Sequence, residues 1–189
     1  MNNLKSDDVI YTPLPLYHSA GGILGVGQSL LFGNGVVLRN KFTASQFWSD
    51  CVRYRATVIQ HIGSMCRYLL SEPERPEEWL HDVRLVLGSG LSKEIWTEFK
   101  TRFAIETVAE FYGSTEAICN LVNTDNTIGA VGSIPKSLPI RRNIAIVKVD
   151  HISGEILRSP VTDLGLECAA GEPGELVGKL SEKHSIRER

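Results

Sequence analysis

Short apolar runs alternate with amphipathic stretches as far as about residue 125. The runs are rich in β-branched residues, which is typical of buried strands. In the stretches between them, apolar residues recur every three or four positions, as on a helix that packs on one face. This pattern predicts strands at residues 9–11, 36–38, 56–62, 83–87 and 107–112, and helices at 19–32, 43–54, 64–70 and 92–103.

Because strands and helices alternate in this way, the expected fold class is α/β, a parallel sheet with flanking helices. A smaller β-rich part should follow, with short strands at residues 144–149 and 155–157 joined as a hairpin. The predicted organisation is therefore an α/β part at 1–125, a β-rich part at 126–178 and a charged, disordered tail at 179–189.

Two local signals refine the helices. Thr43 and Gln46 have the spacing of a capping box, so the second helix should begin at Thr43. Pro73 and Pro76 lie between two predicted elements and indicate a surface loop.

Composition narrows the function classes. The 189 residues carry a net charge of −2 with a pI near 6.2, which gives no electrostatic footprint for nucleic acid. The four cysteines are widely spaced and form no zinc or redox motif. No transmembrane segment is expected, because the longest apolar stretch, residues 20–32, is too short to cross a bilayer.

Candidate chemistry follows two neighbouring strands. The last predicted strand of the α/β part runs into Tyr112-Gly113-Ser114-Thr115-Glu116, and the strand before it ends in Gly88-Ser89-Gly90. Open α/β sheets bind ligands at the carboxyl ends of their strands, and hydroxyl and carboxylate oxygens suit Mg²⁺ bound to a nucleotide. Two simpler interpretations stay open: Ser114 or Thr115 caps a following helix, and the glycine triplet is an ordinary turn.

Three blocks, PLPLYHSAGG, VRLVLGSGLSKEIWTEF and EFYGSTE, stand in this order along the chain. Together they resemble the adenylate-forming acyl-CoA synthetase superfamily, and within it the fatty acid transport protein, or very-long-chain acyl-CoA synthetase, branch. The resemblance extends from about Asp8 to Gly178. It implies that the fold is part of the N-terminal AMP-binding domain of an ATP-dependent long- or very-long-chain fatty acid–CoA ligase that acts through an acyl-adenylate.

The resemblance also implies roles for individual residues. Thr115 would hydrogen-bond the phosphate and Glu116 would ligate Mg²⁺ as the catalytic pair. The nucleotide would be bound by Gly88, Ser89, Gly90, Tyr112, Gly113 and Ser114. The acyl pocket would be bordered by His18, Gly21 and Gly22, although a core histidine and tight helix packing explain these three residues equally well. His61 stands where an aromatic residue is expected.

By the same resemblance, the substrates are ATP with Mg²⁺, a fatty acid and CoA. The full-length protein would be membrane-associated, with a cytosolic catalytic face at the endoplasmic reticulum or plasma membrane, and a homodimer is a possible state. The family's phosphate loop, ribose-binding Asp and C-terminal lysine have no counterpart here; Thr162-Asp163-Leu164-Gly165 has the wrong order. We therefore expect a central fragment that does not form acyl-AMP alone.

Two alternatives remain at this stage. One is a non-catalytic slice of the fold that binds only lipid or a partner. The other is an adenylating domain for amino acids or aryl acids.

Overall fold

The computed structural model describes residues 4–114, 119–134 and 143–179. The chain divides into two compact units, and each is described by itself. The first unit comprises Met1–Tyr112 and Leu121–Ser133, and the second comprises Gly113–Asn120 and Ile134–Arg189. The predicted tail beyond Lys179 lies outside the described residues, and the predicted division at residue 125 stays a prediction.

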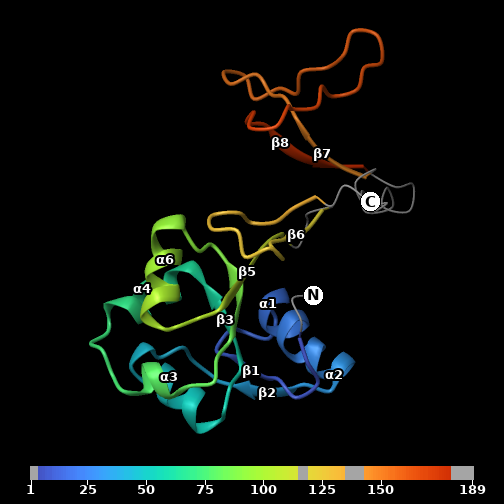
Figure 1. Ribbon diagram of the computed structural model, residues 1–189. Coiled ribbons are helices and arrows are strands. Elements are labelled where there is room, and N and C mark those ends of the chain that lie inside the picture. Colours follow the sequence, from blue (N-terminus) through green and yellow to red (C-terminus); the bar gives the residue numbers. More distant parts are fainter. Residues whose placement is uncertain (1–3, 115–118, 135–142, 180–189) are drawn as a thin grey trace. The chain divides into compact units, whose positions relative to one another are not determined.

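The first unit is built on a six-stranded sheet with the order β2-β1-β3-β4-β5-β6 (Figure 1). The first five strands pair in parallel, and β6 pairs antiparallel to β5. This confirms the expected α/β fold with a parallel sheet. The strands are β1 Val9–Thr12, β2 Gly35–Leu38, β3 Val58–Ile62, β4 Leu85–Ser89, β5 Thr107–Tyr112 and β6 Leu121–Val122.

Helices connect the parallel strands. The helix predicted at 19–32 is present, but its middle turn is a π-helix, η1. The helices are α1 Ser19–Gly21, η1 Gly22–Gly27, α2 Gln28–Phe32, α3 Ala44–Arg53, α4 Gly63–Ser71, α5 Glu77–Leu80 and α6 Lys93–Arg102.

The predicted surface loop at Pro73 and Pro76 is present, since residues 72–76 lie outside the helices and 73–76 are exposed. A short helix that was not predicted, α5, follows it directly, because proline fits the start of a helix and the guanidinium of Arg102 holds the Glu78 carboxylate at 2.8 Å. The prediction of a capping box at Thr43 was wrong. Thr43 is the residue at the helix start but its side chain makes no capping bond, and the Gln46 side chain accepts a hydrogen bond from Arg39 instead.

Helices cover both faces of the sheet (Figure 1). On one face, the aromatic side chains of α3 and α6 pack with α4 over Ile59, Val86 and Val108. On the other face, Leu24 of η1 packs over a smaller apolar cluster. The alternation follows from the period of two along each strand, which sends Val58 and Ile59 to opposite faces.

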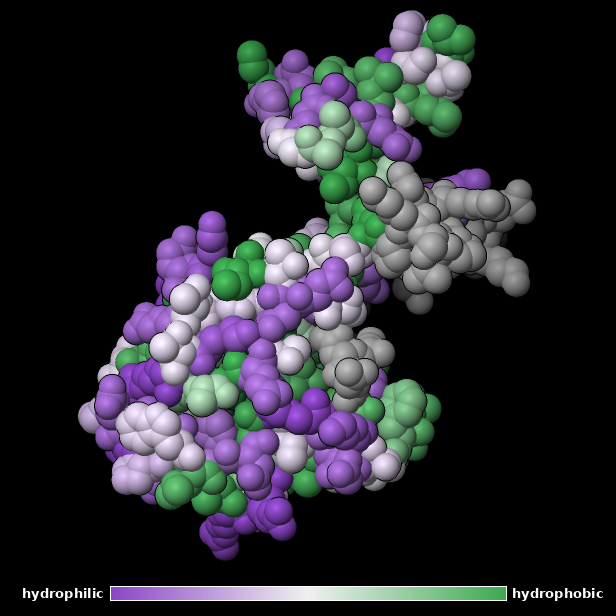
Figure 2. Space-filling view, viewed as in Figure 1, coloured by the Kyte–Doolittle hydropathy of each residue, from purple (hydrophilic) through white to green (hydrophobic). Residues whose placement is uncertain are grey.

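The outer side of η1 and α2 is apolar and exposed. Ile23, Leu30, Leu31 and Phe32 each expose more than half of their surface, and Figure 2 shows apolar side chains on this part of the first unit. Among the described residues, no helix is long and apolar enough to cross a membrane.

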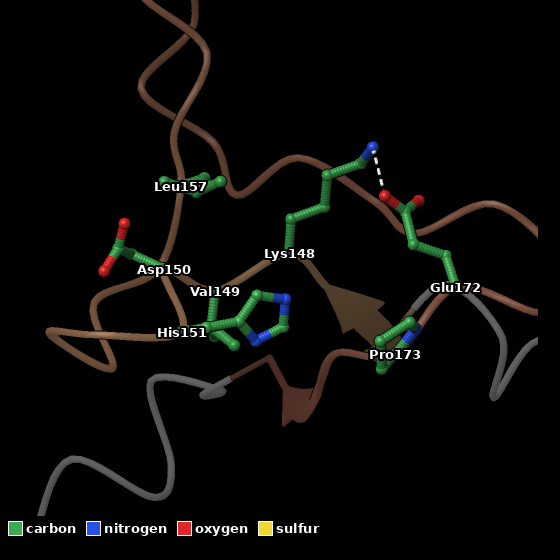
Figure 3. A pocket seen from close by; sticks show the side chains of 7 residues that line it. All are labelled: Lys148, Val149, Asp150, His151, Leu157, Glu172 and Pro173. Atoms are coloured by element: carbon green, nitrogen blue, oxygen red, sulfur yellow. Dashed lines mark hydrogen bonds and ion pairs between the residues drawn. The ribbon is translucent and has the colours of Figure 1, made fainter.

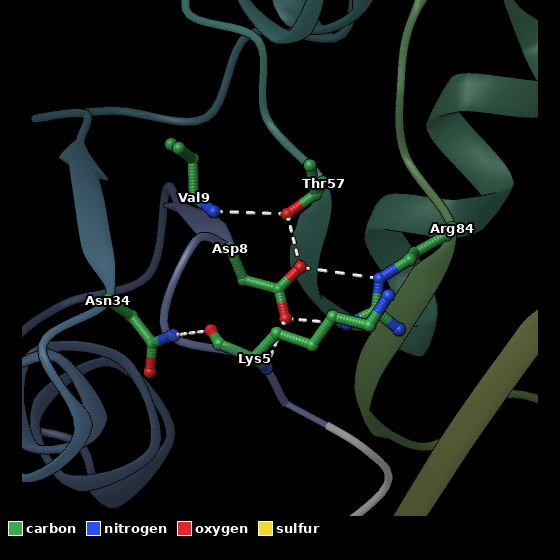
Figure 4. A network of polar contacts seen from close by, with 6 residues as sticks. All are labelled: Lys5, Asp8, Val9, Asn34, Thr57 and Arg84. Carbon is green, nitrogen blue, oxygen red and sulfur yellow. Dashed lines mark hydrogen bonds and ion pairs between the residues drawn. The ribbon is translucent and has the colours of Figure 1, made fainter.

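A polar network ties the amino ends of three parallel strands together (Figure 4). Asp8, just before β1, is 3% exposed, and its carboxylate accepts hydrogen bonds from the Lys5 backbone, from Thr57 before β3 and from Arg84 before β4. Thr57 in turn accepts the Val9 backbone N–H at 3.0 Å. Burial alone would raise the pKa of Asp8, but these donors and the Arg84 charge hold the pKa below its usual range.

Replacing Asp8 by alanine is expected to lower the free energy of unfolding by about 2–3 kcal/mol, because the buried donors lose their acceptor. Since the folded pKa is depressed, this contribution is present above about pH 4 and is lost as pH falls further. Urea unfolding at pH 7 and pH 3 measures both effects. Asp7→Ala, an exposed neighbour, is the control; equal losses for the two variants would contradict the assignment.

The second unit has a small antiparallel sheet, in which β7 (Ile144–Val147) pairs with β8 (Glu175–Gly178). The predicted hairpin turn is present, because the Asp150 carbonyl accepts the Gly154 N–H and the Asp150 N–H reaches the Glu155 carbonyl. The second arm of the hairpin is weaker than predicted. Ile156 forms a single bridge with Val149 instead of a strand.

Candidate functional site

The sheet has a topological switch point between β1 and β3. After β1 the chain leads into η1, whose Leu24 packs on one face of the sheet, whereas after β3 it enters α4 on the other face. Loops that leave neighbouring parallel strands in opposite directions open a crevice at the carboxyl ends of those strands. The predicted site residues of the first unit lie at or after the carboxyl ends of β1, β4 and β5.

The loops after β3 and β4 touch through their main chains. A side chain at Gly63, the first residue of α4, would overlap the carbonyl oxygen of Gly90. Gly90 itself has φ +84°, a conformation that favours glycine. The turn Gly88–Gly90 is thus fixed against the start of α4, while Gly90 stays exposed and Ser89 half-buried.

Of the predicted acyl-pocket residues, His18 lies in the loop after β1, and Gly21 and Gly22 lie in the helical segment that follows it. His18 is exposed, and its carbonyl accepts the Gly22 N–H at 2.8 Å. A Cβ on Gly21 would lie 2.6 Å from the Pro15 carbonyl oxygen, and one on Gly22 would overlap the carbonyl of Leu16. Both glycines therefore let the helix start fold closely onto the preceding loop, and their part in an acyl pocket stays a prediction.

The predicted nucleotide motif begins at the end of β5. Tyr112 is half-exposed and pairs with Leu121 of β6, so the chain turns back after the motif. Gly113 and Ser114 are exposed and belong to the second unit; a side chain at Gly113 would overlap the Asn120 side-chain oxygen. Thr115 and Glu116 lie outside the described residues.

Beneath these loops lies a buried pair of titratable side chains. His61 on β3, Gly88 on β4 and Glu110 on β5 are in register across three strands. Both side chains are 1% exposed, with the His61 Nε2 atom 3.6 Å from Glu110 Oε2. A Cβ on Gly88 would overlap the His61 ring, so only glycine lets the histidine reach across β4.

Burial shifts the two pKa values in opposite directions. It raises the pKa of Glu110 to about 7, although the backbone N–H groups of Leu91 and Gly90 oppose this shift. It lowers the pKa of His61 to about 4. Because each shift disfavours the charged form, the pair is neutral in slightly acidic solution and gains its negative charge on Glu110 near pH 7.

Sequence reasoning did not find this pair. His61 was singled out only because it stands where an aromatic residue is expected, and Glu110 was given no role. Two signals were present: a charged residue inside the apolar run 107–112, and the parallel register that follows from the fold. Gly88 lies between the two residues and leaves room for their side chains to meet, but this can be recognised only once the strand order is known.

Glu110→Gln is expected to stabilise the protein at pH 8 but not at pH 5. The folded-state pKa of Glu110 is raised, so its stabilising contribution is complete below the ordinary pKa and is lost as pH rises through about 7. The uncharged glutamine avoids that loss, which lowers the free energy of unfolding by at most about 3 kcal/mol. Urea unfolding at both pH values measures it; a gain of equal size at pH 5 would contradict the shift.

The second unit carries a pocket of about 400 Å³ (Figure 3). Lys148, Asp150, His151 and Glu172 line it, together with Val149, Leu157 and Pro173. Three of its charged side chains have partners within the second unit. Lys148 is paired with Glu172 at 2.7 Å, and Asp150 accepts hydrogen bonds from the N–H groups of the following turn. None of the predicted site residues lines this pocket. Across the described residues, no cluster of three metal-ligating side chains forms.

Comparison with known proteins defines the class. The AMP-binding enzyme family matches residues 1–179, so the chain belongs to this family. The chain is 48% identical over 184 residues to human long-chain fatty acid transport protein 1, and the match covers 97% of the chain. It is 40% identical over 180 residues to mouse long-chain fatty acid transport protein 6. The chain spans 28% and 29% of the lengths of these two relatives.

Solved structures agree on the fold. ATP-bound MatB from Rhodopseudomonas palustris superimposes with a TM-score of 0.69 at 23% identity, over 100% of this chain and 36% of that one. The o-succinylbenzoate CoA synthetase MenE from Bacillus subtilis, in complex with ATP and a magnesium ion, superimposes with a TM-score of 0.63 at 24% identity. The match covers 94% of this chain and 35% of that one. At this identity the likeness shows the fold alone.

Proposed function

We propose that the chain is the central part of an ATP-dependent long- or very-long-chain fatty acid–CoA ligase. The observation that carries the proposal is the position of two motifs at the carboxyl ends of adjacent strands. The turn Gly88–Gly90 follows β4 and the motif that begins at Tyr112 follows β5. Membership of the AMP-binding family supports a nucleotide at this edge.

In this proposal the main chain of Gly88–Gly90 lines the nucleotide site, because glycines let the backbone approach a ligand closely. Tyr112 packs beside the adenine, and its half-exposed ring is free of the core. Ser89, Ser114 and Thr115 offer hydroxyls for the phosphates, and Glu116 holds Mg²⁺. These are hard oxygen donors, which fits Mg²⁺; the ion would neutralise phosphate charge.

The acyl substrate is assigned to the segment after β1 that holds His18, Gly21 and Gly22, on the other side of the switch point. The names of the relatives, long-chain fatty acid transport proteins, support a fatty acid as substrate and a membrane-associated enzyme. CoA would accept the acyl group from the adenylate.

The test is ATP–pyrophosphate exchange by the protein at its full natural length. We expect exchange that depends on fatty acids of 16 carbons or more, with little stimulation by benzoate or amino acids. Exchange with aryl or amino acids instead would favour a different adenylating enzyme. If no acid supports exchange but the protein binds fatty acid, the non-catalytic binding function replaces the ligase.

A further inference from the structure

The Glu110 carboxylate connects β5 to the turn after β4. Its Oε1 atom accepts a hydrogen bond from the Leu91 N–H at 2.8 Å. Leu91 follows Gly90 directly and is buried, so this bond anchors the carboxyl end of the turn Gly88–Gly90. Glu110 itself lies two residues before Tyr112, on the strand that leads into the nucleotide motif.

The second oxygen of the carboxylate has a different neighbour. Within the described residues, Glu110 Oε2 and both ring nitrogens of His61 are buried without a hydrogen-bond partner. The 3.6 Å between Oε2 and Nε2 is too long for a hydrogen bond, but a proton on Oε2 would point at the imidazole with a small side-chain movement. Buried polar atoms without partners are rare in proteins, so the missing hydrogen bond between these two side chains calls for an explanation.

The surroundings isolate the pair. The titratable side chains that face the Glu110 carboxyl are His61 on β3 and Cys66 on α4, and burial raises the pKa of the Cys66 thiol to about 12, which keeps it neutral. From β4 comes Gly88, which has no side chain, and from the turn between β4 and α6 the main chain of Leu91. The proton equilibrium of Glu110 is therefore set by its burial, which favours the protonated form, and by the main-chain N–H groups of Leu91 and Gly90, which favour the ionised form.

We propose that Glu110 is a positioning residue for the nucleotide: its ionised carboxylate holds the turn Gly88–Gly90 through Leu91, and transfer of a proton onto Glu110, toward His61, loosens that hold. The inference rests on the proposed nucleotide site. An ionised acceptor makes a stronger hydrogen bond than a neutral one, so the turn is held most firmly above the pH at which Glu110 ionises. ATP affinity should then fall as pH decreases from 8 to 6.

Three variants of the protein at its full natural length test this. Glu110→Gln keeps an oxygen for Leu91 but cannot titrate, so its ATP affinity should lose the pH dependence of the wild type. Glu110→Leu fills similar space without an acceptor and should weaken ATP binding about tenfold at pH 8. Glu106→Gln is the same chemical change at an exposed position before β5. Its ATP affinity should keep the pH dependence of the wild type, including the part that arises from titration of the ATP phosphates.

Hydrogen exchange of the segment 88–92, measured without nucleotide, gives an independent reading. In Glu110→Leu, the Leu91 amide should lose its protection from exchange while the amides of β1 stay protected. In Glu110→Gln, Leu91 and β1 should both stay protected. If ATP binds no variant, the proposed nucleotide site fails, and exchange at Leu91 alone still decides whether Glu110 holds the turn. The inference is overturned if Glu110→Gln keeps the wild-type pH profile, or if Glu110→Leu changes neither ATP affinity nor protection. Should Glu110→Leu not fold, the Glu110→Gln profile decides.

Discussion

Glu116→Gln, made in the protein at its full natural length, is expected to lower the ligase rate by about 10²–10³-fold without unfolding the protein. The substitution keeps the shape of the side chain but removes the charge that would hold Mg²⁺ on the phosphates of ATP. Fatty acyl-CoA formation at saturating ATP, with a melting curve for each protein, measures the effect.

Magnesium dependence separates the ligand role from a general disturbance of the loop. The variant should need a higher Mg²⁺ concentration for half-maximal rate, whereas Glu106→Gln should behave as the wild type in both rate and Mg²⁺ requirement. An unchanged turnover with unchanged Mg²⁺ dependence would refute the role assigned to Glu116.

Gly63→Ala is expected to destabilise the protein by about 4 kcal/mol or more, a loss that only severe steric conflicts produce. The added methyl group would overlap the main-chain carbonyl of Gly90, and neither backbone can move freely. Gly63 begins α4, and Gly90 precedes the buried Leu91, so relief of the overlap would break the contact between the loops after β3 and β4. Urea unfolding and the yield of soluble protein report the effect.

Gly27→Ala is the matched control. Gly27 is helical, at φ −60°, and the nearest atom to an added methyl would be the Gly22 carbonyl oxygen at 3.4 Å, an ordinary contact. Alanine favours a helix by about 1 kcal/mol over glycine, so this variant should be as stable as the wild type or more so. If Gly63→Ala and Gly27→Ala unfold alike, the loop contact is not what requires glycine at position 63.

Local pattern was sufficient to predict the five parallel strands and the longer helices of the α/β part, but not α5 or β6. The strand at 107–112 has the predicted bounds, and the helix at 64–70 extends by one residue at each end. The strand predicted at 83–87 is displaced to 85–89, because Val83 is buried but lies before the ladder that pairs Leu85 with Val58. Apolar character marks burial, whereas strand bounds depend on the partner strand.

Features that depend on distant partners were not predicted. Helix α5 is held by Arg102, 24 residues from its partner Glu78, and the two prolines before it pointed to a loop. The π-helical turn in 22–27 has no periodic signature of its own. The His61–Glu110 pair required both the strand order and a glycine between the strands. The two candidate nucleotide motifs could be proposed from local sequence because each lies at the end of a strand.

The account depends on a nucleotide at the carboxyl ends of β4 and β5. The most direct measurement is photolabelling of the protein at its full natural length with 8-azido-ATP and Mg²⁺, followed by mass spectrometry of its peptides. The account predicts ATP-protectable labelling of peptides that contain Gly88–Gly90 or Tyr112–Ser114. Labelling confined to other segments, such as the Lys148–Pro173 pocket, or labelling that ATP does not prevent, would contradict it.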